Sequence, residues 1–296
     1  MSEQFKDQGG VATMDPSHLT RWLTSRLMTR ISRPAAVAAR HRKAEQARVK
    51  AAAPHRVDYF HQVDEGYSCL AAQTLERIAA RFDIELHCHL VRGQEGKNAP
   101  EPELLAQLAR ADSHQIAAGY GLSFPNHPEA PAAGLVETAS QVLAAQSHSD
   151  FPKAAVSVSD ALWRDDADRL AQLAAELGTA SPEATTAAIE AGTAKRRELK
   201  HYSGAMFYYG GEWYWGVDRL YHLEARLAAL GADTQPGTPL IAPRPSEDLA
   251  GQRDTGQFTL ELYASLRSPY TAVIFDRAVA FAKAAGVTLS LSLIHI

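Results

Sequence analysis

Cysteine is nearly absent from this sequence. The 296 residues include two cysteines, Cys69 and Cys88, and these are not in the C-x-x-C spacing of a dithiol redox centre. Sparse cysteine is typical of proteins from a reducing compartment, so we expect a cytoplasmic location. The same scarcity makes thiol–disulfide oxidoreductase the weakest of the functions considered below.

Long apolar runs and a strong excess of one charge are absent as well. No stretch of about 18 apolar residues occurs, so we expect no membrane span. The first ten residues, MSEQFKDQGG, lack the apolar stretch of a secretory signal, and we expect none. The formal net charge of −4 provides no basic field, so we expect no nucleic-acid partner.

The N-terminal part is predicted to be a disordered segment followed by a helical arm. Residues 1–16 are polar and show no periodicity, whereas 17–54 form the predicted arm. Its apolar residues recur at helical spacing and are Leu19, Trp22, Leu23, Leu27 and Ile31. Between positions 17 and 50 the sequence has nine Arg or Lys residues and one acidic residue, Glu45. We favour a helix whose apolar stripe packs on the domain; the alternative is a basic amphipathic arm for a membrane surface or an acidic partner.

Residues 55–231 have the pattern of one α/β domain. A strand over 55–63, a helix over 67–82 and a strand over 84–91 predict a βαβ unit, whose two strands should be parallel. Residues 101–200 are helical by pattern and are divided by Pro and Gly into about five segments.

A β-hairpin and a last helix are predicted to close this domain. The hairpin turns at Gly210 and Gly211, which can both take positive φ. Asp218 is expected to cap a helix that runs to Leu230 and stops at Gly231.

The beginning of the same pattern returns after a Pro- and Gly-rich segment, 232–256, which we interpret as a linker. Placing Tyr67 on Tyr270 aligns strand with strand and Gly66 with Pro269 at a constant offset of 203 positions. Residues 257–290 are therefore predicted to begin a second, incomplete copy. Its exposed edge and apolar face predict that it folds poorly alone.

The last six residues, 291–296, invite a separate hypothesis. Their sequence, LSLIHI, is encoded in one reading frame of a common sequencing-library transposon end, so we expect an adapter scar. The alternative is a coincidental continuation of an apolar strand.

Three stretches carry a resemblance to a known family. They are Ser268-Pro269-Tyr270 after a strand, residues 151–178 in the helical region, and residues 211–220 at the hairpin. In order and spacing they resemble the DsbA-type thioredoxin-like superfamily, in the branch of 2-hydroxychromene-2-carboxylate isomerase and kappa-class glutathione transferase. The resemblance implies an α/β thioredoxin-like fold with a helical insertion, followed by an incomplete second thioredoxin-like repeat.

The resemblance also implies a catalytic serine. In that branch a serine at the N-terminus of the first helix replaces the redox cysteine and favours the thiolate of glutathione. Ser268 occupies this position, with Pro269 and Tyr270 beside it. Helix N-termini favour anions, which suits such a role. The structural alternative is an N-cap serine with proline at the first helical position.

The first copy departs from the family at two positions. Glu65 replaces the serine, and its carboxylate would repel a thiolate. Ala205 stands where relatives have a cis-proline; we expect a trans bond, because a cis bond before alanine costs about 3–4 kcal/mol. Relatives hold the γ-glutamyl end of glutathione at positions that match Gly216, Asp218 and Arg219. For these residues we favour helix capping and a surface ion pair.

Two further groups of residues could carry chemistry. Cys69 lies in the first turn of its predicted helix, where a thiol pKa can fall, but a core position is favoured. His87 and His89 share a strand face, with His61 expected next to them. We interpret them as filling the sheet face and expect no metal site.

Three functions follow from the sequence. The first is a glutathione-linked isomerase or transferase that acts on a small-molecule substrate through Ser268. The second is a non-catalytic binding or scaffold protein with a degenerate thioredoxin fold. The third is a thiol–disulfide oxidoreductase. A homodimer stays open, and the substrate is not specified.

Overall fold

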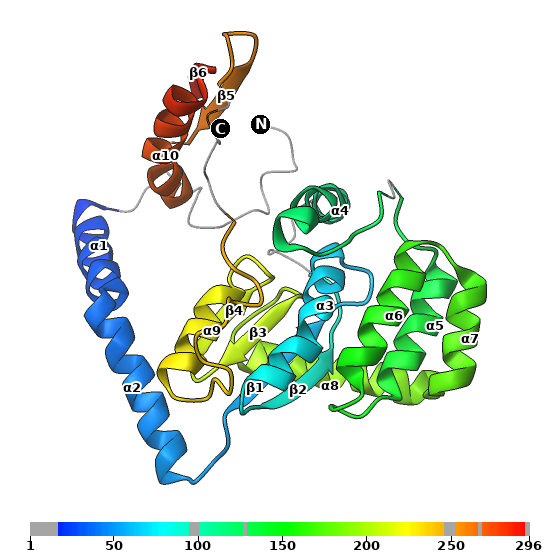
Figure 1. The fold of residues 1–296 in the computed structure, drawn as a ribbon. Helices are drawn as coiled ribbons and strands as arrows, with labels where there is room; N and C mark the ends of the chain where they lie inside the picture. Colours follow the sequence, from blue (N-terminus) through cyan, green and yellow to red (C-terminus); the bar gives the residue numbers. More distant parts are fainter. Residues whose placement is uncertain are drawn as a thin grey trace. The chain divides into compact units, whose positions relative to one another are not determined.

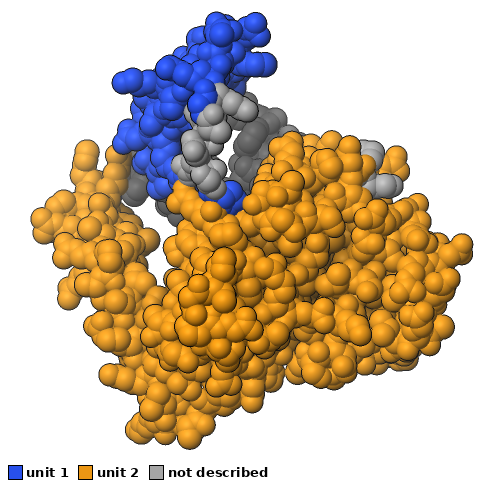
Figure 2. Space-filling model, viewed as in Figure 1, with its two compact units in different colours: residues 1–17, 245–296 blue, residues 18–244 orange. Residues whose placement is uncertain are grey.

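The computed structural model describes residues 17–94, 101–126, 129–245, 251, 253–265 and 268–293. The chain divides into two compact units, shown in separate colours in Figure 2. Unit 2 comprises residues 18–244, and unit 1 comprises 1–17 with 245–296. The predicted disorder of 1–16 and the end of the proposed adapter scar lie outside the described residues.

Unit 2 is built around a four-stranded sheet in the order β2-β1-β3-β4 (Figure 1). The strands are β1 (Arg56–His61), β2 (Glu85–Leu90), β3 (Met206–Tyr209) and β4 (Glu212–Trp215). β1 and β2 are parallel, while β3 runs antiparallel to both β1 and β4. This confirms the predicted βαβ unit and hairpin and the predicted thioredoxin-like fold.

Helix α3 (Gly66–Arg81) connects the two parallel strands. Its buried side chains, among them Leu70, Leu75 and Ile78, belong to the main hydrophobic core together with Tyr59 of β1. Because α3 begins at Gly66, shortly after β1 ends at His61, its N-terminus lies near the end of β1.

The insertion between β2 and β3 is helical, as predicted (Figure 1). Its described helices are α4 (Pro102–Ala117), the short 3₁₀ helix η3 (Ala118–Tyr120), α5 (Ala133–Ala144), α6 (Phe151–Trp163), α7 (Ala167–Leu177) and α8 (Pro182–Glu198). α6 packs on α3, and α8 packs on β2. Gly192 permits the second contact, since a Cβ there would overlap the carbonyl oxygen of Leu90.

The hairpin turn confirms the sequence prediction, with φ of 51° at Gly210 and 86° at Gly211. The capping prediction for Asp218 is wrong. Helix α9 (Leu220–Ala229) begins after Arg219 without a side-chain cap, and the Asp218 carboxylate instead faces the Arg219 guanidinium.

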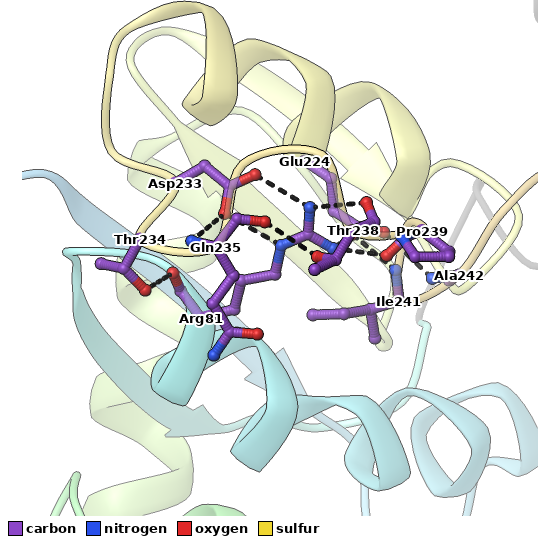
Figure 3. Close-up of polar contacts among 9 residues, drawn as sticks. All are labelled: Arg81, Glu224, Asp233, Thr234, Gln235, Thr238, Pro239, Ile241 and Ala242. Carbon is purple, nitrogen blue, oxygen red and sulfur yellow. Dashed lines mark hydrogen bonds and ion pairs between the residues drawn. The ribbon is translucent and has the colours of Figure 1, made fainter.

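The segment that follows α9 is anchored by two buried carboxylates (Figure 3). Arg81 donates through Nε and Nη2 to the two carboxylate oxygens of Asp233, at 3.0 and 2.8 Å. Glu224 accepts the backbone N–H groups of Ile241 and Ala242 at 2.7 and 3.0 Å. These contacts hold the segment to the C-terminal end of α3 and to α9.

The prediction of a linker over 232–256 is therefore wrong for its first eleven residues. Ala232, Ile241 and Ala242 are buried in the core. Composition suggested a linker because Pro and Gly are frequent there, but those residues form the turns that carry the chain across the domain. Residues 246–250 and 252 lie outside the described part.

The arm is helical, as α1 (His18–Ser32) and α2 (Pro34–Lys50). Our prediction that its apolar stripe packs on the domain is wrong, because no residue of either helix is buried. The stripe is interrupted by charge: Arg26 lies over the ring of Trp22, 4.2 Å from its centroid. Among the described residues, no helix is both long and apolar enough to cross a membrane.

Unit 1 contains the strand, helix and strand predicted after the linker. They are β5 (Thr259–Ala264), α10 (Pro269–Ala285) and β6 (Thr288–Leu293), and the two strands are parallel. Several apolar side chains of this unit are exposed, namely Tyr270, Val273, Ile274, Phe281, Leu291 and Leu293. That it is the start of a second thioredoxin-like domain stays a prediction.

Candidate functional site

Ser268 is the N-cap of α10. Its Oγ accepts the backbone N–H of Tyr270 at 3.2 Å, and Ser268 itself has extended backbone angles. Proline occupies the first helical position, so the predicted cap is confirmed. The ring of Tyr270 is exposed; the side chain of Pro269 lies outside the described residues.

This geometry leaves the Ser268 hydroxyl able to donate. The Tyr270 N–H uses a lone pair of Oγ and leaves the hydroxyl proton for another acceptor. The N-terminal end of α10 also carries partial positive charge. An anion placed next to Ser268 would therefore accept one hydrogen bond from the hydroxyl and be attracted by the partial positive charge of the helix end.

Unit 2 has a different arrangement at the matching position, where Glu65 precedes α3. Ser68 donates its hydroxyl proton to Glu65 Oε2 at 2.7 Å. The Ser68 oxygen in turn accepts the N–H groups of Gln62 at 3.1 Å and of Ala205 at 3.0 Å. Burial raises the pKa of Glu65 to about 7, so the carboxyl group is about half protonated at neutral pH.

Ala205 follows a trans peptide bond, as predicted, since the described residues contain no cis bond. Its φ is +51°, a left-handed conformation that costs a non-glycine residue about 1–2 kcal/mol. Its N–H donates to Ser68, and its carbonyl accepts the N–H of Gly216 at 2.8 Å. The N–H is thus used within the protein and is not left for a bound thiol peptide, and the carbonyl oxygen already accepts one internal hydrogen bond.

A pocket of about 360 Å³ lies beside the N-terminus of α3. It brings together three residues that the sequence singled out, Gly216, Asp218 and Arg219. The other lining residues are Tyr67, Leu70, Asp112, Ile116, Tyr120, Trp215 and Val217. We call this the α3 pocket.

The α3 pocket is lined by positively charged, negatively charged and aromatic side chains. Arg219 Nε lies 3.6 Å from Asp218 Oδ2, and both side chains are more than half exposed. Tyr67 donates its hydroxyl to Asp112 Oδ2 at 2.8 Å and meets Trp215 edge to face. The predicted surface ion pair is confirmed, and the pair faces a pocket that could receive a carboxylate and an ammonium group.

Neither cysteine is placed for thiolate chemistry. Cys69 and Cys88 are free and buried. Burial raises the thiol pKa of Cys69 to about 12, and that of Cys88 rises for the same reason. The core interpretation of Cys69 is confirmed.

His61 lies on the opposite face of the sheet from His87 and His89, so our expectation that His61 lies beside them is wrong. The register pairs Phe60 with His89, and His61, one residue on, points to the other face. His89 Nε2 lies 2.8 Å from Asp58 Oδ1. No cluster in the part of the chain that the structure describes could hold a metal ion.

Sequence reasoning missed two contributors to these sites. Ser68 follows Glu65 by three residues, and this spacing, the reverse of a capping box, was a usable signal. Asp112 lies 45 residues from Tyr67 and carried no local signal, because α4 reaches α3 only through tertiary packing.

Comparisons with known proteins gave matches to solved structures alone. No protein-family model matches the sequence, and no curated protein matches it. One similar structure is a 2-hydroxychromene-2-carboxylate isomerase, 20% identical, with a TM-score of 0.45, covering 60% of this chain and 96% of its own. Another is a probable DsbA oxidoreductase from Streptomyces coelicolor, 14% identical, with a TM-score of 0.44, covering 63% and 92%.

The sheet of unit 2 stands by itself as evidence of fold. Its strand order, its single parallel pair and the helical insertion between β2 and β3 fit a thioredoxin-like fold with a helical insertion, as the sequence predicted.

Proposed function

We propose that this chain is a glutathione-linked isomerase or transferase in which a serine takes the place of a redox cysteine. The observation that carries the proposal is Ser268 at the N-terminus of α10, with its oxygen accepting from Tyr270 and its proton available to donate. The two buried cysteines oppose the oxidoreductase alternative.

Ser268 would act by stabilising a sulfur anion. When glutathione places its thiol next to the serine, the hydroxyl donates to the sulfur, and the helix dipole favours the ionised form. Both effects favour the thiolate over the thiol, so they lower the thiol pKa and raise the fraction of nucleophile at neutral pH. The proton leaves to solvent, and no redox partner is required.

The α3 pocket of unit 2 supports ligand binding rather than thiolate chemistry. The Arg219 guanidinium can pair with the α-carboxylate of a γ-glutamyl group, and Asp218 and Asp112 can pair with its ammonium. Glu65 stands where a thiolate partner would be needed. We propose that this pocket holds a γ-glutamyl group without activating a thiol.

The test of the catalytic residue is a thiol titration. The ultraviolet absorbance of bound glutathione thiolate is followed against pH for the wild type and for Ser268→Ala. We expect the substitution to raise the bound thiol pKa by roughly one unit, because a hydrogen bond to an anion is lost. Ser290→Ala, at an exposed position on β6, is the matched control and should leave the titration unchanged. If Ser268→Ala titrates like the wild type, Ser268 has no role in thiolate formation.

A non-catalytic binding protein is the second candidate, favoured by Glu65 at the serine position of unit 2. Ser268→Ala discriminates the two functions when glutathione binding and turnover are both measured, and Arg219→Ala tests whether binding uses the α3 pocket. If the chain binds glutathione through the α3 pocket and Ser268→Ala changes neither turnover nor thiol pKa, the binding function is correct. Arg164→Ala, in an exposed pair with Asp160, is the matched charge control.

A further inference from the structure

A second pocket of unit 2 has Glu65 in its lining. It has a volume of about 220 Å³ and shares no lining residue with the α3 pocket. Its polar lining comes from Gln62, Asp64, Glu65 and Gln94. Four residues of the α4 segment supply the apolar side, namely Pro102, Leu105, Ala106 and Ala109. We call this the Glu65 pocket.

The hydrogen bonds of Ser68 determine which oxygen of Glu65 can carry a proton. A hydroxyl has one proton and two lone pairs, and both acceptor positions of Ser68 receive backbone N–H groups, from Gln62 and Ala205. The Ser68 proton must therefore go to Glu65 Oε2, where the distance is 2.7 Å. Ser68 cannot accept a proton from Glu65, so a protonated Glu65 carries its hydrogen on Oε1.

Close packing keeps the carboxyl group in this position. A Cβ at Gly204 would overlap Glu65 Oε2, so the glycine makes room for the carboxylate. Glu65 is largely buried, and hydrogen bonds from the described residues reach Oε2 alone. Oε1 is thus the carboxyl oxygen left to interact with a molecule in the pocket.

The charged and titratable groups around Glu65 favour a neutral occupant. Asp64, in the loop before α3, opposes ionisation, and Arg196 of α8 favours it more weakly than burial opposes it. Tyr59 of β1 and Tyr67 of α3 are phenols whose own pKa values are raised, so they are neutral. The lining residues of α4 carry no charge. An anionic ligand would meet two carboxyl groups here, whereas an uncharged one avoids this repulsion.

We propose that the Glu65 pocket binds a small uncharged molecule with an apolar body, whose carbonyl oxygen accepts a hydrogen bond from Oε1 of Glu65. The amides of Gln62 and Gln94 supply further polar contacts, and the α4 residues cover the apolar part. The site is distinct from Ser268 and from the γ-glutamyl residues of the α3 pocket, and it does not depend on glutathione.

The probe for this site is N,N′-diisopropylcarbodiimide, a small uncharged reagent that adds to protonated carboxyl groups. The acid proton moves to a reagent nitrogen, the carboxyl oxygen bonds to the central carbon, and rearrangement leaves a stable acylurea. The folded full-length chain is labelled at a series of pH values, and modified peptides are mapped by mass spectrometry. Circular dichroism confirms that each variant is folded.

We expect Glu65 to be the main labelled residue at pH 6. Labelling should fall by half near pH 7 and about tenfold by pH 8, following the protonated fraction. Glu65→Gln should abolish this label. Ala106→Trp, which narrows the pocket from the exposed side of α4, should reduce it severalfold, and Ala111→Trp on the same helix should not.

Three results would overturn the proposal. One is the absence of a Glu65 label in the folded chain at pH 6. Another is a pH profile like that of exposed carboxyl groups, already lost by pH 6. The third is equal labelling in the Ala106→Trp and Ala111→Trp variants, because the reagent would then reach Glu65 without entering the pocket.

Discussion

Removal of the Arg81 side chain tests how unit 2 holds the segment that follows α9. Arg81 is buried, forms two hydrogen bonds with Asp233 and lies 3.8 Å from Glu224 (Figure 3). The Glu224 side chain is only 1% exposed. Arg81→Met keeps most of the apolar volume and removes the charge, which leaves two carboxylates without their cation.

The expected cost in free energy of unfolding follows from the burial of Arg81 and Glu224. Breaking a buried ion pair by removing one partner costs about 3–5 kcal/mol, because the remaining charge is uncompensated. Glu224 keeps its hydrogen bonds from Ile241 and Ala242, so we expect the lower end, about 3 kcal/mol. For a domain of this size the corresponding fall in Tm is roughly 6–12 °C.

The assay is thermal unfolding followed by circular dichroism, with urea unfolding to obtain the free energy. Arg77→Met is the matched control, since Arg77 is exposed one turn earlier on α3. We expect Arg77→Met to change the free energy of unfolding by less than about 0.5 kcal/mol. If the two variants unfold alike, the Arg81 cluster does not hold the segment.

Three further predictions concern the surroundings of the sites. Ser68→Ala leaves the buried N–H of Ala205 and the part-buried N–H of Gln62 unpaired, and it should cost about 2–4 kcal/mol in urea unfolding. The control Ser140→Ala should cost less than about 1 kcal/mol, because that hydroxyl bonds within its own helix. Gly192→Ala should force α8 away from β2 and lower Tm by several degrees, whereas Gly134→Ala, with open space around it, should not lower it. The pKa of Glu65 is raised from 4.5 to about 7 in the folded chain. As pH rises, the Glu65 carboxyl group therefore loses its proton at a lower pH in the unfolded chain than in the folded chain. Relative to Glu65→Gln, stability should fall by roughly 3 kcal/mol between pH 4.5 and 7 and then level off; equal pH profiles would contradict the raised pKa.

Local patterns in the sequence predicted much of the fold. The strand, helix and strand over 55–91 and the two-glycine hairpin are short-range signals, and the structure confirms them. The Ser268 cap was predictable for the same reason, because its partner lies two residues away. These elements depend on periodicity and turn chemistry rather than on distant contacts.

The errors came from contacts that the sequence does not show locally. The segment over 232–242 has the composition of a linker, and its order comes from Arg81 and Glu224, far from it in the chain. Asp218 has the right residue type for a cap, but an ion pair with Arg219 competes for its carboxylate. The apolar residues of α1 have helical spacing, and spacing alone does not specify a surface to cover them.

The Glu65 position shows how burial changes a prediction made from residue type. As an ionised carboxylate, Glu65 would repel a thiolate. Burial raises its pKa to about 7, and Ser68 fixes the orientation of its proton. The position is thus a partly protonated acid at neutral pH, which the sequence alone did not indicate.

The most direct test of glutathione binding, on which the proposed function depends, is a calorimetric titration of the intact chain with reduced glutathione. The account predicts saturable binding that Arg219→Ala weakens about tenfold, because a charged hydrogen bond to the ligand carboxylate is lost, and that Arg164→Ala leaves unchanged. The absence of binding at millimolar glutathione by a folded chain would contradict the account.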